Sequence, residues 1–254
     1  MKNHRNYLKV TLDMFVIQLM WAFGVLGVLL IVQIFKLFFG NNTDQYYSAF
    51  FIIANIFTFV IGIIAIHFLP YYVENGVTRK DYFKGATLAS IGLAIILPFL
   101  AWGISALTQL ILQSISSLTF KEPNLDAMTN DGNLVGDIIQ FLILTPYVNP
   151  ENNLILSLGI FSLNILMYYL AGWLIGAAFY RYHTVIGLGF IAMTLAVLTL
   201  VNVLVRNTLN LPVLENYSFI DLPRNIAIPV IVLIALILIG SIRSITKDVT
   251  IKMH

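Results

Sequence analysis

Six long runs of apolar residues constrain the fold of this chain more than any other feature of its sequence. A helix needs about 20 mostly apolar residues to cross roughly 30 Å of hydrocarbon. The runs that meet this requirement are Met14–Phe35, Tyr47–Leu69, Gly85–Leu112, Leu154–Tyr180, Thr184–Val205 and Ile226–Ile242. They are continuously apolar and do not alternate with polar residues, so they predict helices and not β-barrel strands. We therefore expect an all-α membrane protein in which residues 1–254 form a single transmembrane domain.

The amino-acid composition agrees with this class of protein. Hydrophobic residues make up 59% of the chain and charged residues 10%, whereas a soluble domain carries about 25% charged residues. The polar residues between the apolar runs are too few to build a separate soluble domain. The chain contains no cysteine, which excludes disulfide scaffolds, thiolate metal sites and cysteine nucleophiles.

The distribution of Lys and Arg predicts the orientation of the spans, because these residues stay on the cytoplasmic side. If both termini are cytoplasmic, the inner segments hold Lys2, Arg5, Lys9, Arg79, Lys80, Lys84, Arg181, Arg243, Lys247 and Lys252. The outer segments then keep only Lys36, Lys121, Arg206 and Arg224. This asymmetry predicts six spans with both termini inside.

A seventh apolar run, Ile138–Val148, is too short to be a seventh span. It has about half the length that a span needs, and it contains Pro146. If it crossed the membrane, the basic residues that follow it would face outward. We expect this segment to be a re-entrant or interfacial helix on the outer side.

The stretch "YYVENGVTRKDYFKG", residues 71–85, concentrates charge between the second and third spans. Asn75 and Gly76 tolerate the left-handed backbone conformation that ends a helix. Thr78, with Asp81 three residues later, is a variant of the capping box that begins a new helix. The aromatic residues beside these charges suit docking into a groove on a soluble partner. Taken alone, however, they are more typical of an ordinary cytoplasmic loop whose aromatics lie in the membrane interface, because basic aromatic loops are common in membrane proteins.

The segment "ENGVTRKDYFKG" resembles the first cytoplasmic loop of ABC-2 type transporter permeases. The short basic N-terminus, the six spans and the outer element "FLILTPYVNPENN" extend this resemblance over nearly the whole chain. The resemblance implies the ABC-2 permease fold, with a short coupling helix between the second and third spans that contacts the ATPase. The residues implied in this ATPase-coupling loop are Glu74, Asn75, Gly76, Val77, Thr78, Arg79, Lys80, Asp81, Tyr82 and Phe83.

The same resemblance implies the partners and the location of the chain. An ABC-2 permease pairs with a second copy or a paralogue and with two ATPase subunits in the bacterial plasma membrane. More narrowly, the chain is similar to membrane subunits of the staphylococcal exporter of phenol-soluble modulins, which are small amphipathic helical toxins. This similarity implies export of an amphipathic peptide, or of another amphipathic molecule. No nucleic acid is expected among the partners.

Motifs for chemistry are missing from the sequence. There is no GxxxxGK[ST] phosphate loop, so ATP and Mg are expected to act only through the partner ATPase. There is no HExxH or GxSxG motif, and the four histidines show no metal-ligand spacing. We therefore expect no catalytic, cofactor-binding or metal site. The alternative to a permease is a membrane anchoring or sensing subunit that recruits a soluble partner without moving a substrate.

Two patterns inside the spans predict contacts between helices or with a substrate. Four small or polar residues of the second span share one helical face: Ser48, Asn55, Thr58 and Gly62. Such a face packs against another helix or lines a substrate path, and helix packing is the commoner case. Gly172 and Gly176 form a GxxxG pattern in the fourth span, which we interpret as packing within the chain.

The orientation can be tested with single cysteines, because the natural chain has none. Cysteines at Asn75 and Ser244 should be shielded in intact cells from a membrane-impermeant thiol reagent. A cysteine at Asn130 should react, because it lies in the long outer connection of the predicted topology. Labelling of Ser244→Cys from outside would indicate an odd number of spans.

Overall fold

The computed structural model describes residues 6–39, 43–115, 120–121, 145–211 and 222–249. In this part of the chain there are seven helices and one pair of very short strands. The elements are α1 (Asn6–Phe39), β1 (Thr43–Asp44), α2 (Tyr46–Ala65), α3 (Phe68–Glu74), α4 (Arg79–Ile115), β2 (Phe120–Lys121), α6 (Leu154–Arg181), α7 (Thr184–Leu209) and α8 (Arg224–Thr246). All helices except α3 are long and apolar enough to cross a membrane, by length and composition. The six predicted spans are thus confirmed as helices of membrane-spanning length.

The second span ends earlier than predicted, because of a proline. Pro70 has no N–H with which to bond the carbonyl of Ile66, and its ring clashes with that carbonyl in a continuous helix. Helix α2 accordingly ends at Ala65, and the chain turns at Ile66 and His67. A separate short helix, α3, then begins at Phe68 and carries Pro70 in its first turn, where proline is tolerated.

The first and third spans are longer than predicted. Helix α1 has 34 residues and begins at Asn6, and α4 has 37 residues and begins at Arg79. At about 1.5 Å per residue, both helices exceed the roughly 30 Å of the hydrocarbon core. They must therefore tilt in a bilayer or project beyond it.

The segment predicted as a re-entrant or interfacial helix, Ile138–Val148, is only partly covered by the structure. Residues 138–144 lie outside the described residues. The last four residues, from Thr145 to Val148, are not helical. At these four positions the prediction of a helix is wrong, and Pro146 accounts for it because proline has no N–H to donate within a helix.

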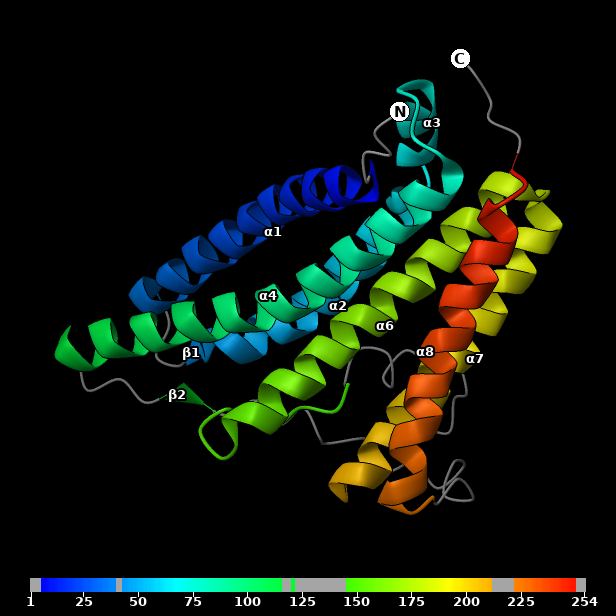
Figure 1. Cartoon of the computed structure of the whole chain (residues 1–254). Helices are drawn as coiled ribbons and strands as arrows, with labels where there is room; N and C mark the ends of the chain where they lie inside the picture. The colour runs from blue at the N-terminus through cyan, green and yellow to red at the C-terminus, as the bar shows by residue number, and fades with distance from the viewer. Residues whose placement is uncertain (1–5, 40–42, 116–119, 122–144, 212–221, 250–254) are drawn as a thin grey trace.

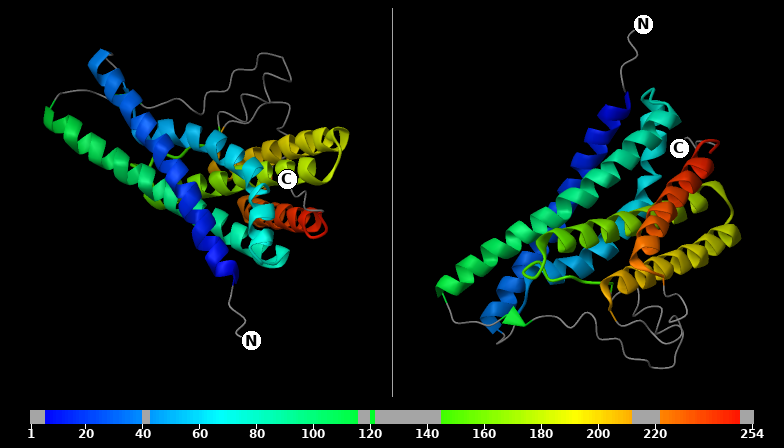
Figure 2. Two further views of the ribbon diagram at one scale, coloured as in Figure 1. Left: turned by 90° about the horizontal axis from the view of Figure 1, so that it is seen from above. Right: turned by 60° about the horizontal axis from the view of Figure 1, so that its bottom comes forward.

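Helix α6 is the centre of the bundle. It packs against α2 and α4 on one side and against α7 and α8 on the other, as Figure 1 shows. Every residue from Met167 to Ala178 is buried. Helix α1 lies along α4, and the beginning of α1 and the end of α8, which lead to the two termini, lie at the same end of the bundle (Figures 1 and 2). At the opposite end, β1 pairs in parallel with β2, with Thr43 opposite Phe120.

Glycines bring α2 and α6 into backbone contact. A Cβ atom built on Gly172 would lie 3.0 Å from the backbone nitrogen of Ile63, and closer still to the carbonyl of Phe59. A Cβ on Gly62 would lie 2.9 Å from the backbone nitrogen of Trp173. Gly176 approaches the backbone of Ile63 in the same way. The GxxxG pattern therefore packs within the chain, as predicted.

The polar face of α2 is buried inside the bundle. The side-chain amide of Asn55 donates a 2.9 Å hydrogen bond to the hydroxyl of Thr145, in the segment that leads into α6. The hydroxyls of Ser48 and Thr58 donate to backbone carbonyls three and four residues earlier in the chain, at 2.8 and 2.7 Å. These contacts, with the backbone approach at Gly62, favour helix packing over a substrate path.

Arg206 differs from its predicted place. The fifth apolar run ends at Val205, so Arg206 was expected beyond the span, in the outer segment that follows it. Instead α7 continues to Leu209, and Arg206 is a fully buried residue near its end. The helix ends at Asn210, which has a left-handed conformation with φ +56°, as is common where a helix stops.

Substitution of Gly172 tests the α2–α6 contact. Gly172→Ala should lower the free energy of unfolding by about 1–3 kcal/mol, because the added methyl group meets backbone atoms that cannot rotate away. Gly159→Ala, in the same helix, is the matched control, since nothing lies within 4 Å of its Cβ position. Thermal unfolding in detergent should show a lower midpoint for Gly172→Ala only. Equal midpoints for both variants would contradict the close contact.

Candidate docking platform at the end that carries the termini

Helix α3, the turn after it and the beginning of α4 form one compact unit at the end of the bundle that carries both termini. We call this unit, residues 68–84, the platform. It contains all the residues of the predicted ATPase-coupling loop. Figures 1 and 2 show α3 at this end, beside the beginning of α1.

The turn inside the platform closes α3 with a glycine. Gly76 has φ +79°, a conformation that side chains other than glycine rarely adopt. Its N–H donates to the carbonyl of Val73 at 3.0 Å, and the N–H of Val77 donates to the carbonyl of Tyr72 at 2.9 Å. This pair of bonds is the Schellman motif of helix ends. The predicted left-handed backbone conformation is confirmed for Gly76 and wrong for Asn75, whose φ is −84°.

The beginning of α4 is capped as the sequence predicted. The Thr78 hydroxyl oxygen accepts a 3.1 Å hydrogen bond from the backbone N–H of Asp81. The same hydroxyl donates to the Asp81 carboxylate at 2.9 Å. Because Asp81 lies in the first turn of α4, its negative charge also faces the positive end of the helix dipole.

The short helix α3 lies earlier in the chain than the coupling helix that the resemblance implied for residues 74–83. Of residues 74–83, only Glu74 belongs to the short helix α3, and residues 75–78 form the turn. Arg79–Phe83 are already the beginning of the long helix α4. The displacement follows from Pro70, which begins a helix ahead of the charged segment, and from Thr78, which begins the next one.

Tyr82 faces the interior and is not available to a partner. Its side chain is fully buried, and its hydroxyl donates to the backbone carbonyl of Ala65 at the end of α2. Phe83 is half-buried against Trp173 of α6, with 5.7 Å between ring centroids. The expectation that both rings project toward a soluble partner is wrong. They attach the platform to the bundle instead.

Two further contacts attach the platform to α1. The hydroxyl of Tyr72 donates a 2.7 Å hydrogen bond to the carboxylate of Asp13. Burial raises the pKa of Tyr72 above its ordinary value, and its hydrogen bond to Asp13 raises it further. Tyr72 therefore remains a protonated donor at physiological pH. The Lys84 ammonium lies 5.8 Å from the ring centre of Tyr7, within reach of a cation–π interaction.

Arginine side chains join the platform to the end of α8. The guanidinium of Arg243 lies 5.4 Å from the ring centre of Phe83 and donates to the carbonyl of Arg79 at 3.4 Å. Arg79 in turn donates to the carbonyl of Lys247 at 3.3 Å. Arg181, at the end of α6, donates to two further carbonyls at the end of α8 at 2.8 and 2.9 Å. Arg79 and Arg181 thus bond carbonyl groups at the C-terminal end of α8, which a helix leaves unpaired.

The remaining face of the platform is open to solvent. Its largest apolar contribution is Tyr71, whose side chain is 58% exposed. The exposed residues of the platform are Tyr71, Glu74, Asn75, Gly76, Thr78, Lys80 and Lys84. An exposed aromatic ring among charges of both signs can bind a complementary protein surface. Among the described residues, no group of three or more His, Cys, Asp or Glu side chains could hold a metal ion.

Sequence reasoning missed the side chains that hold the platform in place. Arg181 and Arg243 were considered only as topology signals, and Asp13 was not considered at all. Their partners lie 59 to 164 residues away in the chain. No local pattern in the sequence could have indicated these pairings.

The fold and this site define a helical multi-pass membrane protein with a solvent-facing platform attached to four of its long helices. No protein-family model, no curated protein and no solved structure matches the chain.

Gly76→Ala tests the conformation of the platform turn. Nothing lies within 4 Å of the Cβ position at Gly76, so the cost of about 1 kcal/mol should come from the positive φ alone. Gly103→Ala has equally open surroundings and no positive φ, which makes it the control. Hydrogen exchange of peptides covering residues 71–79 should become faster in Gly76→Ala only. Unchanged exchange would mean that the turn tolerates a side chain.

Proposed function

We propose that the chain is the permease subunit of an ATP-driven exporter of the ABC-2 type, with both termini cytoplasmic. The permease pairs with itself or a related subunit, and two separately encoded ATPases seat on the platforms of the pair. The observation that carries this proposal is that the platform has one solvent-exposed face and is attached at several points to α1, α2, α6 and α8. A partner that moves the platform therefore moves the membrane bundle with it.

The exposed face has the composition of a docking site. Tyrosine is among the residues that contribute most to protein interfaces when they become buried. Tyr71 is placed to fill this role, in place of Tyr82 and Phe83, which face inward. Glu74 and Lys80 are also exposed on the platform and carry opposite charges, which would set the orientation of a partner more than the affinity.

The energy for transport must come from outside the chain. A carrier driven by an ion gradient normally places carboxylates or other ionisable residues near the bilayer midplane. In the long helices described here, Asp, Glu, Lys and Arg lie only within about two turns of a helix end. The sequence also lacks a phosphate loop. Both observations support a separate ATPase as the source of energy.

The proposed substrate is an amphipathic peptide, similar to phenol-soluble modulins, that leaves the cell across the bacterial plasma membrane. The spans are almost uncharged and rich in aromatic and aliphatic residues. Such a surface suits molecules with a large apolar face. The alternative function, membrane anchoring of the ATPase without transport, would use the same platform. A transport assay distinguishes the two functions, because only an exporter moves a substrate.

Affinity purification from the native host tests the docking of an ATPase. A protein with a phosphate-loop motif should co-purify with the chain, and Tyr71→Ala should reduce its recovery about tenfold or more, because the ring is the main apolar group of the exposed face. His183→Ala, at an exposed position in the turn between α6 and α7, is the control and should change nothing. Absence of a phosphate-loop ATPase, or equal recovery with both variants, would refute the proposal.

A further inference from the structure

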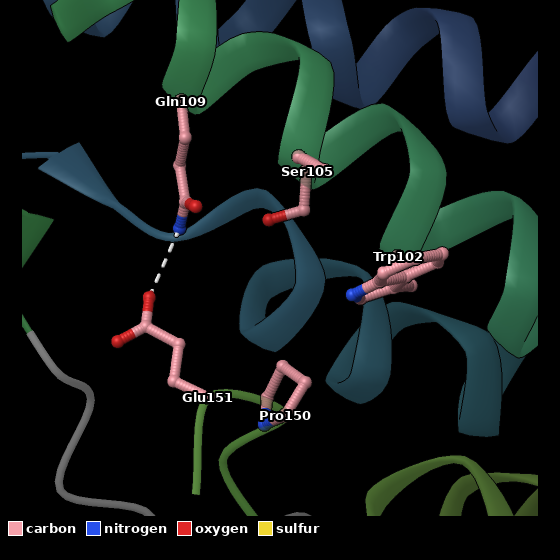
Figure 3. A pocket seen from close by; sticks show the side chains of 6 residues that line it. Trp102, Ser105, Gln109, Pro150 and Glu151 are labelled. Atoms are coloured by element: carbon pink, nitrogen blue, oxygen red, sulfur yellow. Dashed lines mark hydrogen bonds between the residues drawn. The ribbon is translucent and has the colours of Figure 1, made fainter. Parts of the chain in front are cut away.

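At the end of the bundle opposite the termini, a cavity of about 100 Å³ opens between α4 and the segment that leads into α6. Figure 3 shows the side chains of α4 facing those of this segment across the opening. The described residues that line it are Trp102, Ser105, Ala106, Gln109, Pro150 and Glu151. The cavity lies at the other end of the bundle from the platform.

A carboxylate is fixed at the mouth of this cavity. Oxygen Oε1 of Glu151 accepts hydrogen bonds from the side-chain amides of Gln45 at 3.2 Å and of Gln109 at 3.4 Å. These two amides hold the carboxylate between the beginning of α2 and the far end of α4. Glu151 is exposed to solvent, and it is the one charged side chain among the described lining residues. The cavity therefore favours a cation over an anion or a neutral polar group.

The other walls of the cavity fit an alkyl chain that carries this cation. Trp102 is 39% exposed and lines the opening, and an indole face attracts ammonium groups. Ala106 and Pro150 supply apolar surface for methylene groups. The hydroxyl of Ser105 and the amide of Gln109 add hydrogen-bonding groups that an ammonium head can share with the carboxylate.

We propose that this cavity binds a primary alkylammonium group. Glu151 accepts a charge-assisted hydrogen bond from the ammonium, Trp102 presents its indole face to the same cation, and Ala106 and Pro150 contact the alkyl chain. The alkylammonium group is a lysine side chain of the exported amphipathic peptide as it leaves the outer end of the bundle. This assignment of the group to a peptide rests on the proposed export function. The amine headgroup of a phospholipid is the other source of the same chemistry, and the experiment separates the two.

The test uses the purified full chain in nanodiscs made only of phosphatidylglycerol, which has no amine. Binding of pentylammonium, an analogue of the lysine side chain, is measured by saturation-transfer NMR, with pentanol as the neutral comparison. Glu151→Gln should weaken pentylammonium binding about tenfold, because it removes the charge and keeps an oxygen acceptor for Gln45 and Gln109. Trp102→Leu should weaken it severalfold by removing the aromatic face.

Asp248→Asn is the control, because Asp248 is an exposed carboxylate at the other end of the bundle and belongs to neither proposed site. It should leave the affinity unchanged. Equal affinity for pentylammonium and pentanol, or a Glu151→Gln variant that binds as tightly as the natural chain, overturns the proposal. Neither measurement needs the ATPase, so failure here leaves the proposed export function standing, and failure of ATPase docking leaves this site standing.

Competition identifies the source of the ammonium group. Displacement of pentylammonium by a lysine-containing amphipathic peptide, but not by its analogue with glutamine in place of lysine, identifies the peptide. Displacement only when the discs contain phosphatidylethanolamine identifies the lipid headgroup. Displacement by neither overturns the proposal, because no source of alkylammonium at the membrane then reaches the cavity.

Discussion

The contact between α2 and α6 is the interaction on which the rest of the bundle depends. In lipid, apolar side chains gain little by leaving one hydrocarbon surface for another, so helices associate through close packing and buried polar contacts. Gly62, Gly172 and Gly176 remove the side chains that would keep the two backbones apart. Helix α6 thereby becomes a buried axis, against which α4, α7 and α8 also pack. The platform and the cavity lie at opposite ends of this arrangement.

The parts of the structure that follow from local sequence were predictable, and the parts that depend on distant contacts were not. Apolar length predicted the six spans, and Thr78 and Gly76 predicted the cap and the turn, because each signal acts within a few residues. The direction of Tyr82 was not predictable, because it depends on which face of α4 meets the end of α2. The candidate cavity was missed for the same reason, since Gln45 and Glu151 are 106 residues apart in the chain.

Attachment of the platform to four helices would transmit a displacement by the proposed ATPase to the membrane bundle. Buried aromatic contacts and arginine–carbonyl hydrogen bonds connect it to α2, α6 and α8, and the Tyr72–Asp13 bond connects it to α1. A loosely attached loop would absorb a displacement by bending, whereas a unit fixed at several points transmits it. Tyr82 and Phe83, in the first turns of α4, are internal anchors, and Tyr71 is the aromatic residue of the platform that remains exposed.

The central claim is that ATP-driven displacement of the platform moves an amphipathic peptide through the bundle. The most direct measurement is ATP-dependent movement of a fluorescent, lysine-containing amphipathic helix across vesicles that hold the chain and its co-purified ATPase. We predict movement that requires both ATP and the chain, away from the side where the ATPase binds. ATP hydrolysis by a bound ATPase without peptide movement would contradict the claim and identify the chain as a membrane anchor.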